Sequence, residues 1–305
     1  MLGGQTCIHS YRPATTINAE GEDAFTFLQG QFTNELRQAA GNVVYGLWLN
    51  QKGRVLADSQ ILRLSEREFR IVSTASIAAI ISQRLQEYII ADDVVLTNET
   101  EKFFGLALWG VGCGEQVKQL FGMVPGAGQF QANDECLVFA GRRVSGENYE
   151  IIGSEKKTAE LRETLSRLGC RKVGVNEVEA ARIADSVPTV PQDIGPGDLP
   201  NEGNLEGSAI SFTKGCYLGQ EVMARLKSMG QVRRHLRVVR GPGAAPKPGT
   251  PLYQAGKKAG ETRSVALTAD GYIAMAMLTR LGFNENAGYS LTAEGPVVAT
   301  INPHG

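Results

Sequence analysis

Hydrophobic residues in this chain are concentrated in short runs, which polar and glycine-containing segments separate. In the first hundred residues these runs predict strands at residues 43–49, 54–64, 69–73 and 94–98. The polar segment 50–53 joins the first two strands and is typical of a turn. The pattern therefore predicts a hairpin followed by two further strands.

A helix is predicted between the last two of these strands. Ser76 is placed to cap its start, and apolar residues recur at helical spacing on one face. The residues of this face are Ile77, Ile80, Ile81, Leu85 and Tyr88. Further along, the pattern predicts strands at 103–109, 136–140 and 149–152 and helices at 115–121 and 156–168. Antiparallel strands mixed with packed helices indicate an α+β fold of two sheet-plus-helix units, rather than a doubly wound parallel sheet.

The amino-acid composition of the chain changes after residue 240. Segment 241–251 is rich in proline and glycine, which breaks any regular element and is typical of a domain boundary. Short strands are predicted beyond it at 252–254, 260–267, 272–277 and 297–301. We expect a body at 1–240, made of two interleaved subdomains with the second at about 55–170, and a small β-barrel at 241–305.

Composition and charge are those of an ordinary globular protein. Of 305 residues, 42% are hydrophobic and 21% are charged, and the net charge of -1 argues against a surface built throughout for nucleic acid or anionic membrane. The longest nearly apolar run, 103–112, is shorter than the about 20 residues of a membrane helix. Segment 1–7 lacks the basic and apolar regions of a secretory signal. These features predict a cytoplasmic protein without a membrane or stable nucleic-acid partner.

Cysteine and histidine usage agrees with a reducing compartment and predicts no tightly held metal. The five cysteines are scattered, and none forms a Cys-x-x-Cys pair. They are Cys7, Cys113, Cys136, Cys170 and Cys216. The histidines His9, His235 and His304 are remote from one another, whereas ligands of a structural zinc site normally cluster in the sequence.

The octapeptide 214–221, Lys-Gly-Cys-Tyr-Leu-Gly-Gln-Glu, places one thiol between two glycines. Good helix formers follow Gly219, so we expect a helix that starts directly after it. Cys216 then precedes a helix N-terminus and has Lys214 nearby, and both features favour the thiolate needed in a nucleophile or metal ligand. The alternative is a small buried core residue, because free cysteine is among the most buried residue types.

The octapeptide matches all seven fixed positions of Lys-Gly-Cys-Tyr-x-Gly-Gln-Glu. Segments 27–34, 182–188 and 199–205 match further motifs that accompany it, although Ser186 stands where glycine is usual. On these residues the chain resembles the YgfZ family, which comprises folate-binding proteins related to the aminomethyltransferase (T-protein) of the glycine cleavage system. The resemblance runs from about residue 20 to the end.

This resemblance implies a T-protein-like folate-binding body of two ferredoxin-like or mixed α+β units around a central cleft, with a C-terminal β-barrel. It implies tetrahydrofolate as the cofactor and iron-sulfur client or assembly proteins as partners. Cys216 and Lys214 are the implied reactive residues. The implied folate-binding residues are Asn34, Asp58, Arg182, Tyr217, Gln220 and Glu221.

Several of these residues have ordinary alternatives. Asp58 occupies the position of an acid near the folate in aminomethyltransferases, where a carboxylate can hold a pterin nitrogen or orient an amine. It is otherwise a polar residue on the solvent face of a strand. Lys214 is otherwise a solvated surface lysine. Gln220 and Glu221 are otherwise first-turn residues that complement the helix dipole.

Position 184 separates the two related families. Aminomethyltransferases have a glutamate there that grips the pterin ring, whereas this chain has Ala184, and Asp185 is one position away. The leading hypothesis is therefore a tetrahydrofolate-binding accessory protein for assembly or repair of iron-sulfur clusters, which indirectly supports tRNA modification. The alternative is a true aminomethyltransferase, and a third class is a scaffold without folate binding.

A basic cluster lies close to the octapeptide, in a segment, 222–240, that contains no acid. It comprises Arg225, Lys227, Arg233, Arg234, Arg237 and Arg240. It fits an anionic folate tail, an acidic partner or RNA phosphate, but also a simply solvated face. No aromatic residues are interleaved with it, which argues against single-strand stacking.

Overall fold

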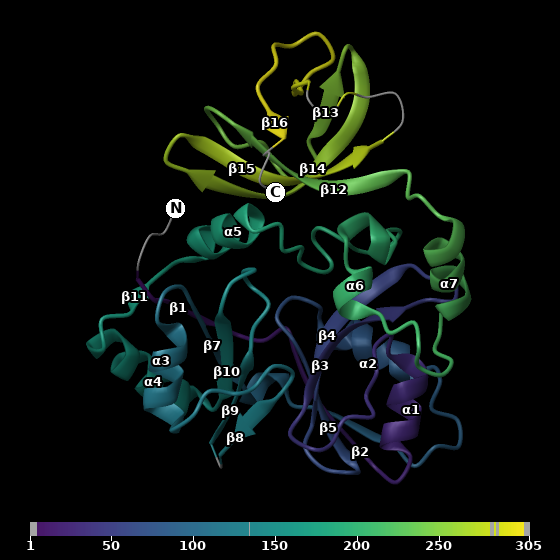
Figure 1. Cartoon of the computed structure of the whole chain (residues 1–305), viewed down its shortest axis with the longest axis vertical. Coiled ribbons are helices and arrows are strands. Elements are labelled where there is room, and N and C mark those ends of the chain that lie inside the picture. The colour runs from purple at the N-terminus through teal and green to yellow at the C-terminus, as the bar shows by residue number, and fades with distance from the viewer. Residues whose placement is uncertain (1–4, 134, 281–283, 285–286, 302–305) are drawn as a thin grey trace.

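The computed structural model describes residues 5–133, 135–280, 284 and 287–301. Their strands form three sheets. In Figure 1 two sheets lie side by side in the lower half, the third lies above them, and helices α5 and α6 lie between the two levels. Between these levels the chain forms short helices and irregular segments. We call this region the middle layer, and it positions the candidate site.

The first sheet has the order β3-β4-β5-β2-β6, and its pairs are antiparallel. Its strands are β2 (Thr15–Glu20), β3 (Val43–Leu49), β4 (Val55–Arg63), β5 (Glu68–Ser73) and β6 (Val95–Asn98). Its helices are α1 (Ala24–Gln31) and α2 (Ala78–Gln86). Trp48, Phe69 and Ile81 are among the fully buried residues of the core between sheet and helices. The predicted hairpin at 43–64 is confirmed.

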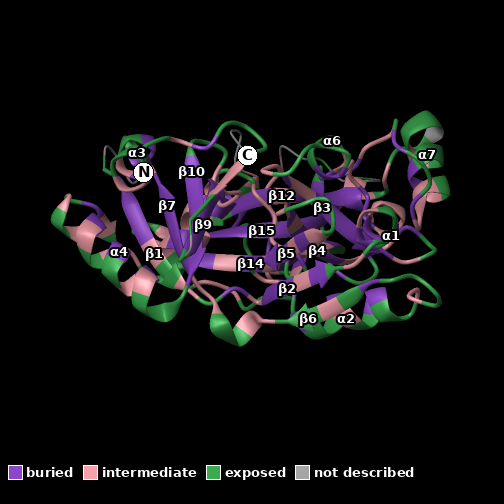
Figure 2. Ribbon diagram, turned by 90° about the horizontal axis from the view of Figure 1, so that it is seen from below, coloured by how far each residue is buried: buried purple, intermediate pink, exposed green. Residues whose placement is uncertain are grey.

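The second sheet has the order β11-β1-β7-β10-β9-β8. Its strands are β1 (Cys7–Tyr11), β7 (Phe104–Trp109), β8 (Phe130–Ala132), β9 (Cys136–Ala140), β10 (Asn148–Gly153) and β11 (Arg171–Lys172). Its helices are α3 (Cys113–Phe121) and α4 (Glu155–Arg167), and a 3-10 turn, η1 (Thr100–Lys102), precedes β7. Strand β10 is buried along its whole length because it lies inside the sheet. Figure 2 shows the resulting contrast between buried strands and the exposed outer faces of α2 and α4.

The third sheet has the order β13-β14-β15-β12-β16 and curls in Figure 1. Its strands are β12 (Arg234–Gly241), β13 (Pro251–Gln254), β14 (Lys257–Thr268), β15 (Gly271–Thr279) and β16 (Thr300–Ile301). Strand β12 begins at Arg234 and ends at Gly241, so the sheet begins before the proline- and glycine-rich segment. The division into a body and a closed C-terminal barrel stays a prediction.

The middle layer consists of α5 (Val175–Ala184), η2 (Pro200–Gly203), α6 (Glu206–Ala209) and α7 (Gln220–Met229). Helix α5 packs against β14 and β15. The core of this layer joins it to both neighbouring sheets, because Leu47 of β3, Ile183 of α5 and Met275 of β15 share one apolar cluster. Burial of this cluster is the main force that holds the third sheet on the body.

The start of α2 differs from the prediction. The helix begins at Ala78, its N-cap is Ile77, and no side chain caps it. The predicted Ser76 cap is therefore wrong, because the Ser76 hydroxyl contacts Asp58 instead. Ile81 and Leu85 of the predicted apolar face are buried, whereas Ile77 and Ile80 are exposed.

Candidate functional site

A polar cavity of about 390 Å³ lies where the first sheet, the second sheet and α5 meet. Its walls include Tyr45, Asp58 and Ser73 from the first sheet, and Arg142 from the β9–β10 connection. Arg182 of α5 completes this set. We call it the Asp58 cavity. Asp58 and Arg182, which are distant in the sequence, are thus brought to one place.

Hydrogen bonds hold both carboxylate oxygens of Asp58. Ser73 Oγ and Ser76 Oγ lie 2.9 and 2.8 Å from Oδ1, and the Tyr45 hydroxyl donates to Oδ2 over 3.2 Å. The backbone N–H of Asp58 donates to Ser76 Oγ over 3.0 Å. Burial raises the pKa of Asp58, and the hydrogen bonds with Ser76, Ser73 and Tyr45 and the charge of Arg142 oppose this rise. Asp58 is therefore not simply a solvent-facing polar residue, and it is suited to hold or release a proton.

Tyr45 and Arg142 form a stacked pair at the same wall. The Arg142 guanidinium carbon lies 3.6 Å from the centroid of the Tyr45 ring, and Nη2 donates to Ser208 Oγ over 3.2 Å. Burial and the nearby Asp58 raise the pKa of Tyr45, so its hydroxyl stays a hydrogen-bond donor. Arg142 forms no ion pair with any residue in the described part of the chain. Its charge is consequently available to a ligand.

The other two arginines of the cavity are already paired. Arg143 Nε donates to Glu150 Oε1 over 2.7 Å. Arg182 bridges Glu179 at 2.5 Å and the fully buried Asp193 at 2.6 Å. Its Nη1 also donates to the carbonyl of Val187 over 3.1 Å. Arg182 therefore ties α5 to the segment that follows it and shapes the wall of the cavity.

Lys214 is buried, with 5% of its surface exposed. Its Nζ donates to the carbonyl oxygens of Gln29, Phe32 and Asn34 over 2.7, 2.6 and 2.8 Å. Burial lowers the pKa of Lys214 to about 8. The solvated surface lysine considered above is excluded, because all three ammonium donors are used at the end of α1.

Cys216 is exposed, whereas the other four cysteines are buried. The inert core residue considered above is therefore excluded. The next residue, Tyr217, is 6% exposed and belongs to the apolar cluster of the middle layer. The thiol consequently lies on a short exposed stretch between two buried anchors, Lys214 and Tyr217. We call residues 211–219 the Cys216 loop.

The predicted helix after Gly219 is confirmed as α7. Gly219 has φ of 87° and packs against the β3–β4 turn, where an added Cβ would lie 2.9 Å from the carbonyl oxygen of Asn50. This position therefore requires glycine. Gln220 is half-buried and Glu221 is exposed in the first turn of α7. Neither these two nor any other octapeptide residue lines the Asp58 cavity.

Asn34 also lies outside the walls of the cavity. Its Nδ2 donates to the carbonyl oxygens of Tyr45 and Ser208 over 2.8 and 3.2 Å. Its Oδ1 accepts the backbone N–H of Glu35 over 2.9 Å. The side chain is fully engaged within the protein and joins three segments.

Sequence reasoning missed Tyr45, Ser73, Ser76 and Arg142. A signal for Tyr45 was present, because the hairpin pairs Tyr45 with Gln60 and Leu47 with Asp58. Tyr45 and Asp58 are therefore diagonal neighbours across the strands. Arg142 had no such signal, because it lies in an irregular connection of the second sheet.

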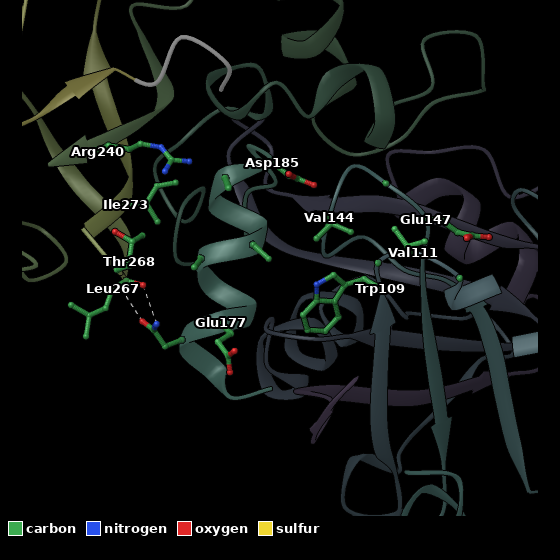
Figure 3. A pocket seen from close by; sticks show the side chains of 18 residues that line it. Trp109, Val111, Val144, Glu147, Glu177, Asp185, Arg240, Leu267, Thr268 and Ile273 are labelled. Carbon is green, nitrogen blue, oxygen red and sulfur yellow. Dashed lines mark hydrogen bonds between the residues drawn. The ribbon is translucent and has the colours of Figure 1, made fainter. Parts of the chain in front are cut away.

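A larger cavity, of about 760 Å³, lies on the other side of α5 (Figure 3). Trp109 and Val144 face α5 there, and Arg240 and Ile273 approach from the third sheet. Ala184 and Asp185 line this cavity and not the Asp58 cavity. The Asp185 carboxylate accepts bonds from the backbone and side chain of Ser145, each 2.9 Å long. Asp185 thus provides no second acid beside Asp58.

No helix in the part of the chain that the structure describes is long and apolar enough to cross a membrane. No group of three or more His, Cys, Asp or Glu side chains in those same residues could hold a metal ion. Within the basic cluster, Arg234 binds Asp198 at 2.9 Å and Glu202 at 3.0 Å, so this member is not a free surface charge.

Comparison with known proteins places these features in a family. The GCVT N-terminal domain model matches residues 10–214. The tRNA-modifying protein YgfZ of Colwellia psychrerythraea is 28% identical over 72% of this chain and 67% of its own length. The human mitochondrial iron-sulfur cluster assembly factor IBA57 is 27% identical over 87% of this chain and 75% of its own length.

A solved structure is similar along nearly the whole chain. The crystal structure of the glycine cleavage system aminomethyltransferase T from Bartonella henselae matches with a TM-score of 0.81 and 18% identity. The match covers 97% of this chain and 84% of that one. At this identity the likeness establishes the mixed α/β fold alone.

Proposed function

Because the chain belongs to the family of the GCVT N-terminal domain, we propose that it binds tetrahydrofolate in the Asp58 cavity. We further propose an accessory role in assembly or repair of iron-sulfur clusters in client enzymes, which indirectly supports tRNA modification. The names of two relatives, a tRNA-modifying protein and an iron-sulfur cluster assembly factor, support this role. All five cysteines are free thiols, as is typical of a reducing compartment, and this supports a cytoplasmic location.

The observation on which the proposal chiefly rests is the environment of Asp58. Its carboxyl group has a raised pKa and forms the wall of a cavity, a combination that is typical of ligand and active sites. The cavity volume of about 390 Å³ is within the range of ligand pockets. The neighbouring Arg142 is a guanidinium without an ion pair in the described chain. These groups fit a polar heterocycle with an anionic tail.

Asp58 would accept an N–H of the bound ring through Oδ2, or hold a proton there. Tyr45 keeps that oxygen oriented, and Ser73 and Ser76 hold Oδ1. Arg142 would attract the carboxylates of the folate tail. Tetrahydrofolate, when bound, supplies a carrier for one-carbon groups. The exposed Cys216 acts separately, as a redox-active or transient ligand thiol toward a client protein.

Calorimetry with a panel of reduced folates tests the ligand. We expect saturable binding to the wild-type protein and to Cys216→Ser, because the thiol does not line the cavity. Asp58→Asn should bind more weakly, since it removes the charge but keeps the size of the side chain. Ser65→Ala is the control, because Ser65 is exposed and lies outside the cavity. Absence of saturable heat with every folate would contradict the proposal.

A second candidate is an aminomethyltransferase of the glycine cleavage type. A carboxyl group able to hold a proton in a polar cavity favours it. The assay supplies aminomethyl-lipoyl carrier protein and tetrahydrofolate, and measures methylenetetrahydrofolate and ammonia. Product formation that Asp58→Asn abolishes would favour this candidate. Folate binding without product favours the accessory role.

A further inference from the structure

The Asp58 cavity and the Cys216 loop share no residue, but one short segment forms hydrogen bonds with residues of both. This segment, residues 32–34, connects α1 to the rest of the first sheet. Phe32 and Thr33 are fully buried. The Thr33 hydroxyl donates to the carbonyl of Ala209 over 2.7 Å and accepts the N–H of Leu47 over 2.8 Å. Segment 32–34 is thus bonded to β3 on one side and to α6 on the other.

Asn34 bonds this segment to the wall of the cavity. Its amide donates to the backbone carbonyl of Tyr45, whose hydroxyl holds Asp58. The same amide donates to the carbonyl of Ser208, whose hydroxyl holds Arg142. Arg142 in turn stacks on Tyr45. Asn34 therefore supports both members of the stacked pair through hydrogen bonds, although it does not line the cavity.

Lys214 bonds the same segment to the Cys216 loop. Its ammonium group binds the carbonyls of Phe32 and Asn34, and Ser211 N–H donates to the carbonyl of Thr33 over 3.0 Å. The two ammonium bonds are 2.6 and 2.8 Å long, so a shift of segment 32–34 shifts the anchor of the Cys216 loop. Only Gly215 separates Lys214 from Cys216 in the chain.

We infer that Asn34 and Lys214 are positioning residues that couple occupancy of the Asp58 cavity to the order of the Cys216 loop. This inference rests on the proposed function. A ligand that contacts Tyr45, Asp58 or Arg142 braces the stacked pair, and through Asn34 it braces segment 32–34 and Lys214. Opening of the Cys216 loop then requires loss of ligand contacts. Ligand binding in the Asp58 cavity and the order of the Cys216 loop consequently affect each other.

Thermodynamic linkage requires that such coupling act equally in both directions. If the ligand stabilises the closed Cys216 loop, then weakening the anchor of that loop must weaken ligand binding by the same factor. Couplings between protein sites are typically about 5- to 150-fold. Contiguity of contacts does not itself demonstrate coupling, so the test measures the coupling factor directly.

The experiment follows backbone hydrogen exchange of residues 211–219 in the full chain, with and without saturating 5-formyltetrahydrofolate. In the wild type we expect ligand to slow exchange of this loop by about fivefold or more. Asn34→Asp keeps the Oδ1 acceptor and the side-chain size but removes the amide donor, so the slowing should disappear while the ligand still binds. Asn42→Asp is the matched control, because the Asn42 amide bonds only locally, to Ala39 over 2.8 Å.

The reciprocal arm measures affinity. Lys214→Arg keeps the charge but cannot reproduce three short bonds, and it should weaken 5-formyltetrahydrofolate binding about fivefold although residue 214 does not line the cavity. Lys52→Arg, at an exposed lysine of the β3–β4 turn, should leave affinity unchanged. Ligand that binds without slowing exchange, or Lys214→Arg with wild-type affinity, overturns the coupling but leaves the proposed function standing. Failure of the wild type to bind overturns the proposed function and the coupling with it.

Discussion

The Asp58 cavity and the Cys216 loop use polar groups in opposite ways. At Asp58, three side chains donate hydrogen bonds to one carboxyl group, yet the wall of the cavity includes Arg142, a guanidinium without an ion pair in the described part of the chain. In the Cys216 loop, the ammonium group of Lys214 donates all three of its hydrogen bonds to backbone carbonyls, and Cys216 is exposed. The first region is built to hold a small ligand and the second to present a thiol.

This difference separates two roles that the octapeptide alone suggested were one. Lys214 is close to Cys216 in the chain, but its ammonium group is directed into the end of α1. It serves as an anchor of the loop. Substitutions in the Asp58 cavity should therefore impair folate binding, whereas substitutions in the Cys216 loop should impair client activity or stability.

The largest effect is expected at Cys216. Cys216→Ser should abolish the activity of iron-sulfur client enzymes in cells that contain only this variant. Its free energy of unfolding should stay within about 0.5 kcal/mol of the wild type, since the thiol is exposed. Activity of a client enzyme in extracts is the measurement. Cys136→Ser, at a buried cysteine, should show the reverse, lost stability with retained client activity. Normal client activity with Cys216→Ser would remove the thiol from the mechanism.

Lys214→Met should cost about 2–4 kcal/mol of unfolding free energy, because it leaves buried carbonyl oxygens without donors. Urea denaturation measures the loss. Lys52→Met, at an exposed lysine, should change stability by less than about 0.5 kcal/mol. Equal stabilities for the two variants would mean that Lys214 is not an anchor.

Asp58→Asn should weaken binding of a reduced folate by about 10- to 100-fold, the cost of losing a charge-assisted hydrogen bond of roughly 1.5–3 kcal/mol. Titration calorimetry measures the change. The variant should be at least as stable as the wild type at pH 7, since burial raises the pKa of Asp58 and so disfavours its charged form. Unchanged affinity would place the ligand elsewhere.

The pH dependence of stability should depend on Lys214. Burial lowers the pKa of Lys214 to about 8 in the folded chain, whereas an unfolded lysine titrates near 10.4. Between these values the unfolded chain binds more protons, so the stability of the wild type relative to Lys214→Met should rise with pH. Its contribution is fully present above the unfolded pKa and is lost as pH falls through about 8. A relative stability that does not rise from pH 8 to 10 would show that the three carbonyls keep the ammonium protonated.

The smallest effect is expected at Glu221. It is exposed in the first turn of α7, so Glu221→Gln should cost at most about 1 kcal/mol through the helix dipole. Folate affinity should not change, because the residue does not line the Asp58 cavity. Calorimetry and urea denaturation measure the two quantities. A tenfold loss of affinity would restore Glu221 as a folate ligand and join the two regions again.

Local pattern was sufficient for much of the fold. The runs at 43–49 and 136–140 form strands with the predicted bounds, and the helix after Gly219 starts where expected. These elements depend on apolar spacing and on the conformational freedom of glycine, which are properties of neighbouring residues. Strand β2 and helix α5 were not predicted, because their burial depends on partners that lie far away in the chain.

Amino-acid order alone identified Cys216, Asp58 and a resemblance to one family, because a reactive residue in a rare local motif needs no partner to be recognised. Packing decided what those residues do. It buried Lys214 in backbone carbonyls, directed Ser76 to Asp58 instead of a helix end, and stacked Arg142 on Tyr45. Each of these contacts joins segments from different sheets or from distant parts of the chain. Their energies arise from burial and geometry that exist only after the chain has folded.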